Sequence, residues 1–199
     1  TLDTSECCIL QGPPGTGKSY TIATIAAAYL EQGRSVCVTT MANSGLVELV
    51  KQPPLKDHLN DGRIYKTSLK ADEMKSATGL KAAAKDLVVP NGSMLCTTYY
   101  KLSSLIGVNS GKVDIDEMFD IIVIEEASQA FLSTIVAFKG LGKKCLIVGD
   151  PMQLPPIVQG LVVKPEYHLW KVDVQCNGMS AFALGSNIKS YRITTTFRL

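Results

Sequence analysis

The feature that most constrains this chain is the octapeptide Gly12-Pro13-Pro14-Gly15-Thr16-Gly17-Lys18-Ser19, which fits the phosphate-loop pattern G-x-x-x-x-G-K-[ST]. An apolar run of strand length, residues 7–10, precedes it, and a segment rich in Ala, Ile and Leu, residues 19–30, follows it. Strand, glycine-rich loop and helix form the context in which this pattern binds phosphate. The alternative is a glycine- and proline-rich turn that fits by chance, and the coincidence of all three features argues against it.

Each part of this loop has an expected physical role. Successive backbone N–H groups point inward and form an anion site, and the following helix adds its positive N-terminal field. Glycine permits backbone angles and close approaches that a Cβ would block. Lys18 is expected to reach the β- and γ-phosphates, and the Ser19 hydroxyl to bind Mg²⁺. The predicted nucleotide-binding residues are Gly12, Pro13, Pro14, Gly15, Thr16, Gly17, Lys18, Ser19 and the adjacent Tyr20.

Strand candidates alternate with helix candidates along much of the chain, which predicts parallel β-α-β units. Further strands are expected at 35–40, 93–98, 119–124, 144–148 and 191–193, and helices at 19–30, 46–50, 99–106, 131–138 and 180–184. The continuous apolar run 119–124 is typical of a central strand that is covered on both faces. We therefore expect an α/β fold, a mostly parallel sheet with helices on both faces, whose ligands bind at the carboxyl ends of the strands.

Residues 52–93 differ in character, because they are polar, rich in lysine and interrupted by glycine and proline. We treat them as an inserted, less regular segment within a single domain that covers residues 1–199. A short strand at 63–65 and a helix at 71–87 are expected there. Its lysines could line a nucleic-acid path, although a solvated face is the commoner explanation. These lysines are Lys70, Lys75, Lys81 and Lys85.

Composition narrows the class of protein. With 46% hydrophobic and 19% charged residues the chain is globular, and a net charge of +2 gives no strong basic field for nucleic acid. Five of the six cysteines lie in apolar, strand-like runs, and no C-x-x-C pair suggests zinc, so we expect a reducing, cytoplasmic setting. No apolar run approaches a membrane span. Both chain ends suggest a fragment of a longer protein.

Two polar clusters follow later strands. Glu125 and Glu126 come directly after the run 119–124, and we assign Glu125 to Mg²⁺ and Glu126 to orienting or deprotonating the attacking water. The alternative is a pair of acids that begins a helix, where the helix dipole stabilises them. After the strand at 144–148, the prolines that follow Gln153 stiffen the loop and hold this side chain toward the γ-phosphate. The alternative there is a proline-rich surface turn.

The order of these motifs, 11–19, then Glu125-Glu126-Ala127-Ser128-Gln129-Ala130, then 149–156, resembles superfamily 1 helicases. The branch it resembles is the nonsense-mediated-decay helicase group with its bacterial and viral relatives. The resemblance implies a RecA-like fold, ATP and Mg²⁺ as ligands, and a γ-phosphate sensor at Gln153. It also implies that Arg198 approaches the γ-phosphate.

The same resemblance implies contacts to single-stranded DNA or RNA. The segment 39–44 is similar to a motif that touches the strand, and Thr97-Thr98 is similar to a second backbone contact. The implied residues are Thr40, Asn43, Ser44 and Thr98, whose short polar groups would hold phosphate oxygens without reading sequence. Strand-end caps and turns remain the alternative for Thr40, Asn43 and Thr98.

The chain also departs from the family pattern. Glu125 stands where relatives usually have Asp, which puts metal affinity in question, and Thr196 stands where relatives often have Gln. The upstream segment that reads adenine in relatives is missing. The second RecA-like domain of the parent chain is missing too, and its arginine finger would be worth a factor of about 10³–10⁵ in rate. We expect the ATP-binding domain of a helicase or translocase. The alternatives are a P-loop ATPase that remodels protein and a nucleotide-binding module that does not hydrolyse.

Overall fold

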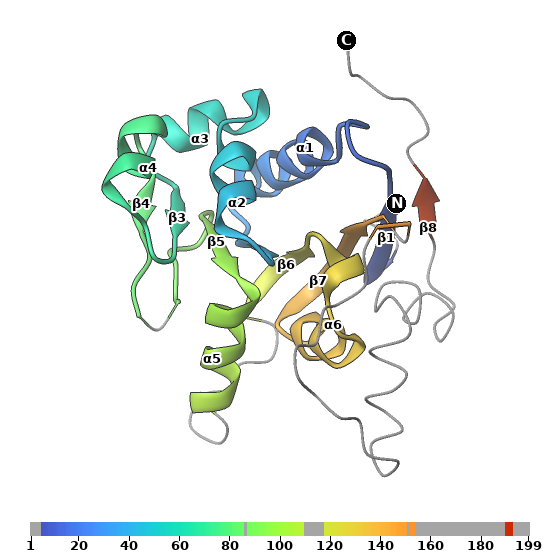
Figure 1. Ribbon diagram of the computed structural model, residues 1–199. Coiled ribbons are helices and arrows are strands. Elements are labelled where there is room, and N and C mark those ends of the chain that lie inside the picture. The colour runs from blue at the N-terminus through green and yellow to red at the C-terminus, as the bar shows by residue number, and fades with distance from the viewer. Residues whose placement is uncertain (1–4, 86, 110–117, 151, 154–189, 193–199) are drawn as a thin grey trace.

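In the computed structural model, which describes residues 5–85, 87–109, 118–150, 152–153 and 190–192, the described strands form one eight-stranded sheet. The order is β4-β3-β5-β2-β6-β7-β1-β8, and every neighbouring pair is parallel (Figure 1). The strands are β1 (Cys7–Gln11), β2 (Val36–Thr40), β3 (Ile64–Lys66), β4 (Lys81–Ala82), β5 (Met94–Thr98), β6 (Phe119–Ile124), β7 (Gly142–Gly149) and β8 (Ser190–Arg192). The predicted α/β fold is therefore confirmed.

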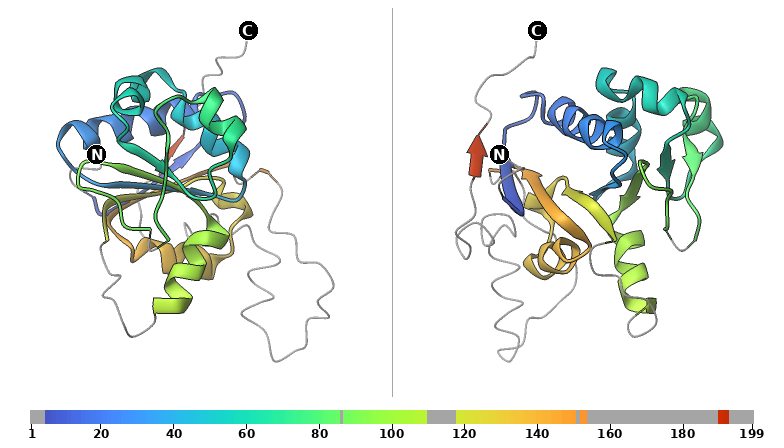
Figure 2. Two further views of the ribbon diagram at one scale, coloured as in Figure 1. Left: turned by 90° about the vertical axis from the view of Figure 1, so that its left-hand side faces the viewer. Right: turned by 180° about the vertical axis from the view of Figure 1, so that it is seen from behind.

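Helices cover both faces of the sheet, as Figure 2 shows from two further directions. The helices are α1 (Lys18–Glu31), α2 (Asn43–Val50), α3 (Lys56–Asn60), α4 (Ala71–Ser76), α5 (Tyr99–Asn109) and α6 (Leu132–Lys139), with short 3-10 turns η1 (Pro53–Leu55) and η2 (Ala127–Gln129). Residues of α1 and α2 belong to one buried apolar cluster, and residues of α5 and α6 belong to the other. The sheet thus separates two hydrophobic cores.

Strand β6 shows why a continuous apolar run is needed at the centre. Ile121 and Val123 belong to the cluster on the α1 side, while Ile122 and Ile124 belong to the cluster on the α5 side. All four side chains are fully buried. Successive side chains of a strand point to opposite faces of the sheet. A strand that is covered on both faces therefore favours apolar residues at successive positions.

Residues 52–93 contain η1, α3, β3, α4 and β4. Strand β3 pairs with β5, and β4 pairs with β3, so both extend the common sheet beyond β5. The predicted helix at 71–87 is wrong in length, because α4 ends at Ser76 and Lys81–Ala82 form a strand. Gly79 explains the break: its φ is +99°, and a Cβ there would lie 2.0 Å from the Leu59 carbonyl oxygen. The alanines that favoured helix lie beyond this turn.

A buried ion pair joins β3 to α4. Lys66 is fully buried, and its Nζ donates to Glu73 Oε2 at 3.0 Å and to the Thr67 carbonyl at 3.3 Å. Glu73 Oε2 also accepts the Lys70 backbone N–H at 2.9 Å. Burial acts to raise the pKa of Glu73, but these hydrogen bonds outweigh it and hold that pKa below its ordinary value. One carboxylate therefore both neutralises Lys66 and caps the start of α4.

The cysteines behave as the sequence predicts. Cys7, Cys8, Cys37, Cys96 and Cys145 are all buried, and Cys7, Cys37, Cys96 and Cys145 are free thiols. Burial raises the pKa of Cys37 well above its ordinary value and that of Cys96 to about 12, so these thiols stay protonated and pack as hydrophobes. Within the described ranges, no helix combines the length and apolar character that crossing a membrane requires. The predicted last strand is found as β8, and the helix predicted at 180–184 lies outside the described residues.

Candidate nucleotide and nucleic-acid site

The phosphate-loop pattern occupies the connection between β1 and α1, as predicted. The Gly12 N–H donates to the Gly149 carbonyl at 3.1 Å, which ties the loop to the end of β7. Gly15 and Gly17 have φ of 78° and 82°, in the left-handed region that strongly favours glycine. The Thr16 hydroxyl is buried and donates to the Pro13 carbonyl at 2.8 Å. The glycines at 15 and 17 are therefore conformational requirements of the loop.

The Lys18 side chain folds back over this loop. Its Nζ donates to the Gly12 carbonyl at 2.6 Å and to the Pro13 carbonyl at 2.9 Å. Burial lowers the pKa of Lys18, while the nearby carboxylates of Asp150 and Glu125 act to raise it. The ammonium thus lies where the loop, the end of β6 and the end of β7 meet. Tyr20, in the first turn of α1, is 53% exposed.

Glu125 follows β6 at the same edge of the sheet. Burial raises the pKa of Glu125 to about 7, the adjacent Glu126 charge adds to this, and Lys18 and a hydrogen bond with Ser19 oppose it. Glu125 Oε2 is buried and has no hydrogen-bond partner among the described residues. An unpartnered carboxylate oxygen beside a serine hydroxyl is a donor set that Mg²⁺ accepts. The residues present therefore fit the predicted metal, and the longer side chain of Glu in place of Asp still reaches Ser19.

Glu126 points to different neighbours. Its φ of 57° and ψ of 33° place a non-glycine residue in the left-handed region, a conformation that costs about 1–3 kcal/mol and clusters at functional sites. Its Oε2 accepts a hydrogen bond of 2.8 Å from the Thr40 hydroxyl. Thr40, predicted from the resemblance to contact nucleic acid, therefore also contacts the second glutamate, and no local sequence pattern predicts this hydrogen bond. The contact follows from the sheet order, since β2 lies beside β6 and the two strand ends meet.

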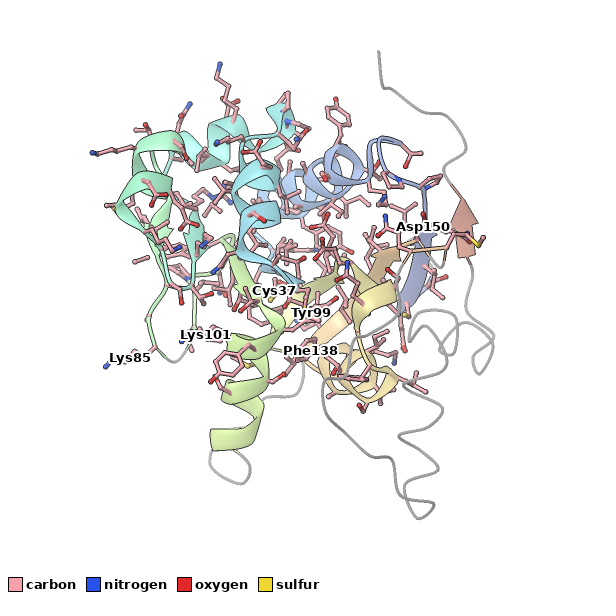
Figure 3. The ribbon with its side chains drawn as sticks, in the orientation of Figure 1. Cys37, Lys85, Tyr99, Lys101, Phe138 and Asp150 are labelled. Carbon is pink, nitrogen blue, oxygen red and sulfur yellow. The ribbon has the colours of Figure 1, made fainter. Side chains whose placement is uncertain are left out.

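Tyr99 makes a second contact to the acidic pair, and it is not among the site residues predicted from the sequence. Its hydroxyl donates to the Glu125 carbonyl, and its ring lies 5.6 Å from that of Phe138, tilted by 58°. Figure 3 labels both rings, which come from α5 and α6. Burial raises the pKa of Tyr99 well above its ordinary value, with smaller contributions from the two glutamates. An aromatic residue directly after the hydroxyl pair 97–98 was the only available signal.

The predicted nucleic-acid residues gather at the ends of two neighbouring strands. Thr40 and Thr98 are register partners in β2 and β5. Asn43 and Ser44 begin α2, and Ser44 is exposed. Asn43 Oδ1 is buried without a hydrogen-bond partner in the described part of the chain. Thr98 Oγ1 accepts the Lys101 N–H at 3.5 Å. The four residues therefore share one stretch of the sheet edge, next to the carboxylates that follow β6.

The end of β7 brings a third polar segment to this edge. Asp150 is buried, its Oδ1 accepts the Met152 N–H at 3.1 Å, and its carbonyl accepts the Gln153 N–H at 2.9 Å. Figure 3 labels Asp150 at this end of the strand. Gln153 is half-buried, and the position of its backbone is set by this turn. Arg198 and Thr196 lie outside the described residues.

Known proteins share this architecture. The UvsW helicase from bacteriophage T4 superposes with a TM-score of 0.54 at 12% identity, covering 94% of this chain and 54% of that chain. The arterivirus nonstructural protein 10 helicase gives a TM-score of 0.51 at 13% identity, covering 97% of this chain and 36% of that chain. At such identities the likeness shows the fold alone, which is RecA-like.

Sequence relatives point to the same class. A DNA replication ATP-dependent helicase/nuclease, JHS1 of Arabidopsis thaliana, is 26% identical over 79% of this chain and 12% of its own length. The human DNA replication ATP-dependent helicase/nuclease DNA2 is 27% identical over 79% of this chain and 15% of its own length. The rat DNA-binding protein SMUBP-2 is 22% identical over 78% of this chain and 20% of its own length. The chain thus spans a fifth or less of these relatives.

A family model described as an AAA domain, AAA_11, matches residues 55–160, a range that holds β3 to β7 and both glutamates. The phosphate loop lies before that range and carries its own pattern. Loop, acidic pair and β7 segment meet at one edge of a RecA-like sheet. The chain belongs to the AAA_11 family and is a RecA-like ATP-binding domain of the superfamily 1 helicase type.

Proposed function

We propose that this chain is the ATP-hydrolysing half of a helicase or translocase that moves on single-stranded nucleic acid. The observation that carries the proposal is the unpartnered, buried Oε2 of Glu125, which lies with Ser19 beside the lysine of the phosphate loop. A buried carboxylate oxygen without a hydrogen-bond partner does not stabilise the fold. Beside Ser19 and Lys18, however, this oxygen suits the binding of Mg²⁺ that accompanies a nucleotide.

The roles of the chain's own residues follow from their positions. Ser19 and Glu125 would hold the ion, which neutralises charge on the phosphates. Lys18 would exchange its two carbonyl contacts for phosphate oxygens. Glu126, directly after Glu125, would orient the attacking water and take its proton. The hydrogen bond from Thr40 would hold the Glu126 carboxylate in place. The resemblance to superfamily 1 helicases further implies that Gln153 senses the γ-phosphate and that Arg198 approaches it.

Single-stranded nucleic acid would run along the ends of β2 and β5. Asn43, Ser44 and Thr98 would donate to its phosphate oxygens, which gives binding without sequence preference. Thr40 is buried and its hydroxyl already donates to Glu126, so it would act through that carboxylate. The printed names of the relatives, a DNA replication helicase/nuclease and a DNA-binding protein, support nucleic acid as the partner. ATP would lie between this domain and a second RecA-like domain of the same parent chain. The buried free thiols support a cytoplasmic location.

The test is Mg²⁺-dependent ATPase of the full-length protein, measured with and without single-stranded DNA or RNA. We expect stimulation by the strand and a loss of about 10²–10⁴-fold in rate for Glu126→Gln. Glu48→Gln, on the exposed surface of α2, serves as the matched control and should keep the wild-type rate. The isolated 199 residues should bind nucleotide weakly and hardly hydrolyse it.

Four results would count against the proposal. A robust ATPase that no nucleic acid stimulates would favour a protein-remodelling ATPase. Equal rates for wild type and Glu126→Gln would contradict the catalytic assignment, and nucleotide binding without any turnover would favour a non-hydrolysing module. Robust strand separation by the isolated domain would contradict the need for a second domain.

A further inference from the structure

We infer that Tyr100 is a platform on which a base of the single-stranded nucleic acid stacks. This inference rests on the proposed function and adds a base contact to a set of residues that hold only backbone. Tyr100 is not among the predicted site residues, and the family resemblance gives it no role.

Exposure separates Tyr100 from the buried residues at the start of α5. The Tyr100 side chain is 80% exposed, whereas the adjacent Tyr99 is 6% exposed and Leu102, the next inward-facing residue of α5, is fully buried. The core therefore uses Tyr99 and Leu102 and leaves the Tyr100 ring in water. Single exposed apolar residues are common on proteins, so position must decide whether this one has a use.

The position of Tyr100 is next to the predicted phosphate contacts. It follows Thr98 by two residues, and Thr98 is the register partner of Thr40 in the neighbouring strand. Met41, directly after Thr40, is 46% exposed. Lys101 is exposed and projects from the first turn of α5, where Figure 3 labels it. Hydroxyls, an ammonium group and an aromatic face thus come from one short stretch of the sheet edge, and this combination binds single strands in proteins.

The backbone that carries Tyr100 is held from both sides. Before it, the Tyr99 ring packs against Phe138, and the Tyr99 hydroxyl donates to the Glu125 carbonyl. After it, the Lys101 N–H donates to Thr98 Oγ1. Only the two side-chain torsions of Tyr100 remain to be ordered when a base stacks, so the entropic cost is small. Since every base has an aromatic face, such a platform would tolerate any sequence.

The test compares two single-stranded ligands of equal length, oligo-dT and a strand whose nucleotides are all abasic. Fluorescence anisotropy gives the dissociation constant of the full-length protein for each. Base–aromatic stacking predicts that Tyr100→Ala weakens oligo-dT binding by about 5-fold to 100-fold and leaves the abasic strand unaffected. Tyr100→Phe keeps the ring and should retain wild-type affinity for both. Val136→Ala, an exposed apolar residue of α6, is the control and should change neither.

Lys101→Ala separates charge from stacking. Loss of one phosphate contact should weaken both ligands alike and lower the salt dependence of binding by about one ion. If wild type binds oligo-dT but Tyr100→Ala leaves that affinity unchanged, or weakens the abasic strand equally, the stacking inference is overturned and the proposed function stands. If wild type binds neither strand, the proposed function itself fails.

Discussion

Replacing Glu125 by Gln should stabilise the protein in the absence of metal and nucleotide. Burial and the neighbouring Glu126 charge raise the pKa of Glu125 from an ordinary 4.5 to about 7. At about 1.36 kcal/mol per pH unit, this difference corresponds to a cost of about 3 kcal/mol for holding the ionised carboxylate in the folded protein. Glutamine resembles the neutral acid and avoids that cost.

The sign and pH range follow from proton linkage. Between pH 4.5 and about 7 the folded state holds the Glu125 proton more often than the unfolded state does. The free energy of unfolding of wild type therefore falls as pH rises through this range, and it levels off above the folded pKa. The Glu125→Gln variant lacks this fall. The variant should be more stable by up to about 3 kcal/mol above pH 7, and the difference should vanish toward pH 4.5.

The assay is urea unfolding in a chelating buffer across this pH range. Glu48→Gln removes an exposed carboxylate and keeps Glu125, so this control should show the same fall in stability with pH as wild type. Addition of Mg²⁺ and nucleotide should reverse the order, because the cation stabilises the wild-type carboxylate and not the amide. A Glu125→Gln variant that is less stable than wild type at pH 8 without metal would refute the burial argument.

Two further variants test the loop and the buried ion pair. Gly17→Ala and Gly33→Ala both place a Cβ at positive φ, 82° and 71°, and Gly33 has nothing within 4 Å of the added atom; both should lose about 1–2 kcal/mol of stability. Only Gly17→Ala should lose nucleotide affinity in a calorimetric titration, and equal affinities would contradict the loop assignment. Glu73→Gln leaves the Lys66 ammonium buried without a counter-charge, so urea unfolding should show a loss of about 3–5 kcal/mol. The exposed pair of Glu48 with Lys51 should give less than about 1 kcal/mol in the same measurement, and a similar loss for both pairs would refute the reasoning.

Local sequence signals were enough to predict most of the fold. The strands β1, β2, β5, β6 and β7 were predicted from apolar runs, and these runs form strands mainly because their side chains are buried. The phosphate loop and the Ser19–Glu125 approach also followed from the sequence, because carboxyl ends of parallel strands share one edge.

What the sequence could not show depends on neighbours that are distant along the chain. The alanines at 82–84 favour helix locally, yet Lys81–Ala82 pair with β3. Glycine is needed at position 79 because the Leu59 carbonyl oxygen lies where a Cβ would be. The complete burial of Lys66 has no local sequence signal, because it depends on the Glu73 carboxylate that α4 brings to the ammonium group. The bonds from Thr40 to Glu126 and from Tyr99 to Glu125 needed the strand order, which no local pattern supplies.

The position of Lys18 also bears on which anions this loop selects. Because its ammonium already donates to two carbonyls of its own loop, an incoming anion must replace both contacts before it gains anything from the charge. A single small anion offers few oxygens in return, whereas a polyphosphate reaches the lysine, the backbone amides and the metal ligands at once. The hydrogen bonds of Lys18 to its own loop would therefore favour the binding of nucleoside triphosphates over that of the inorganic phosphate that hydrolysis releases.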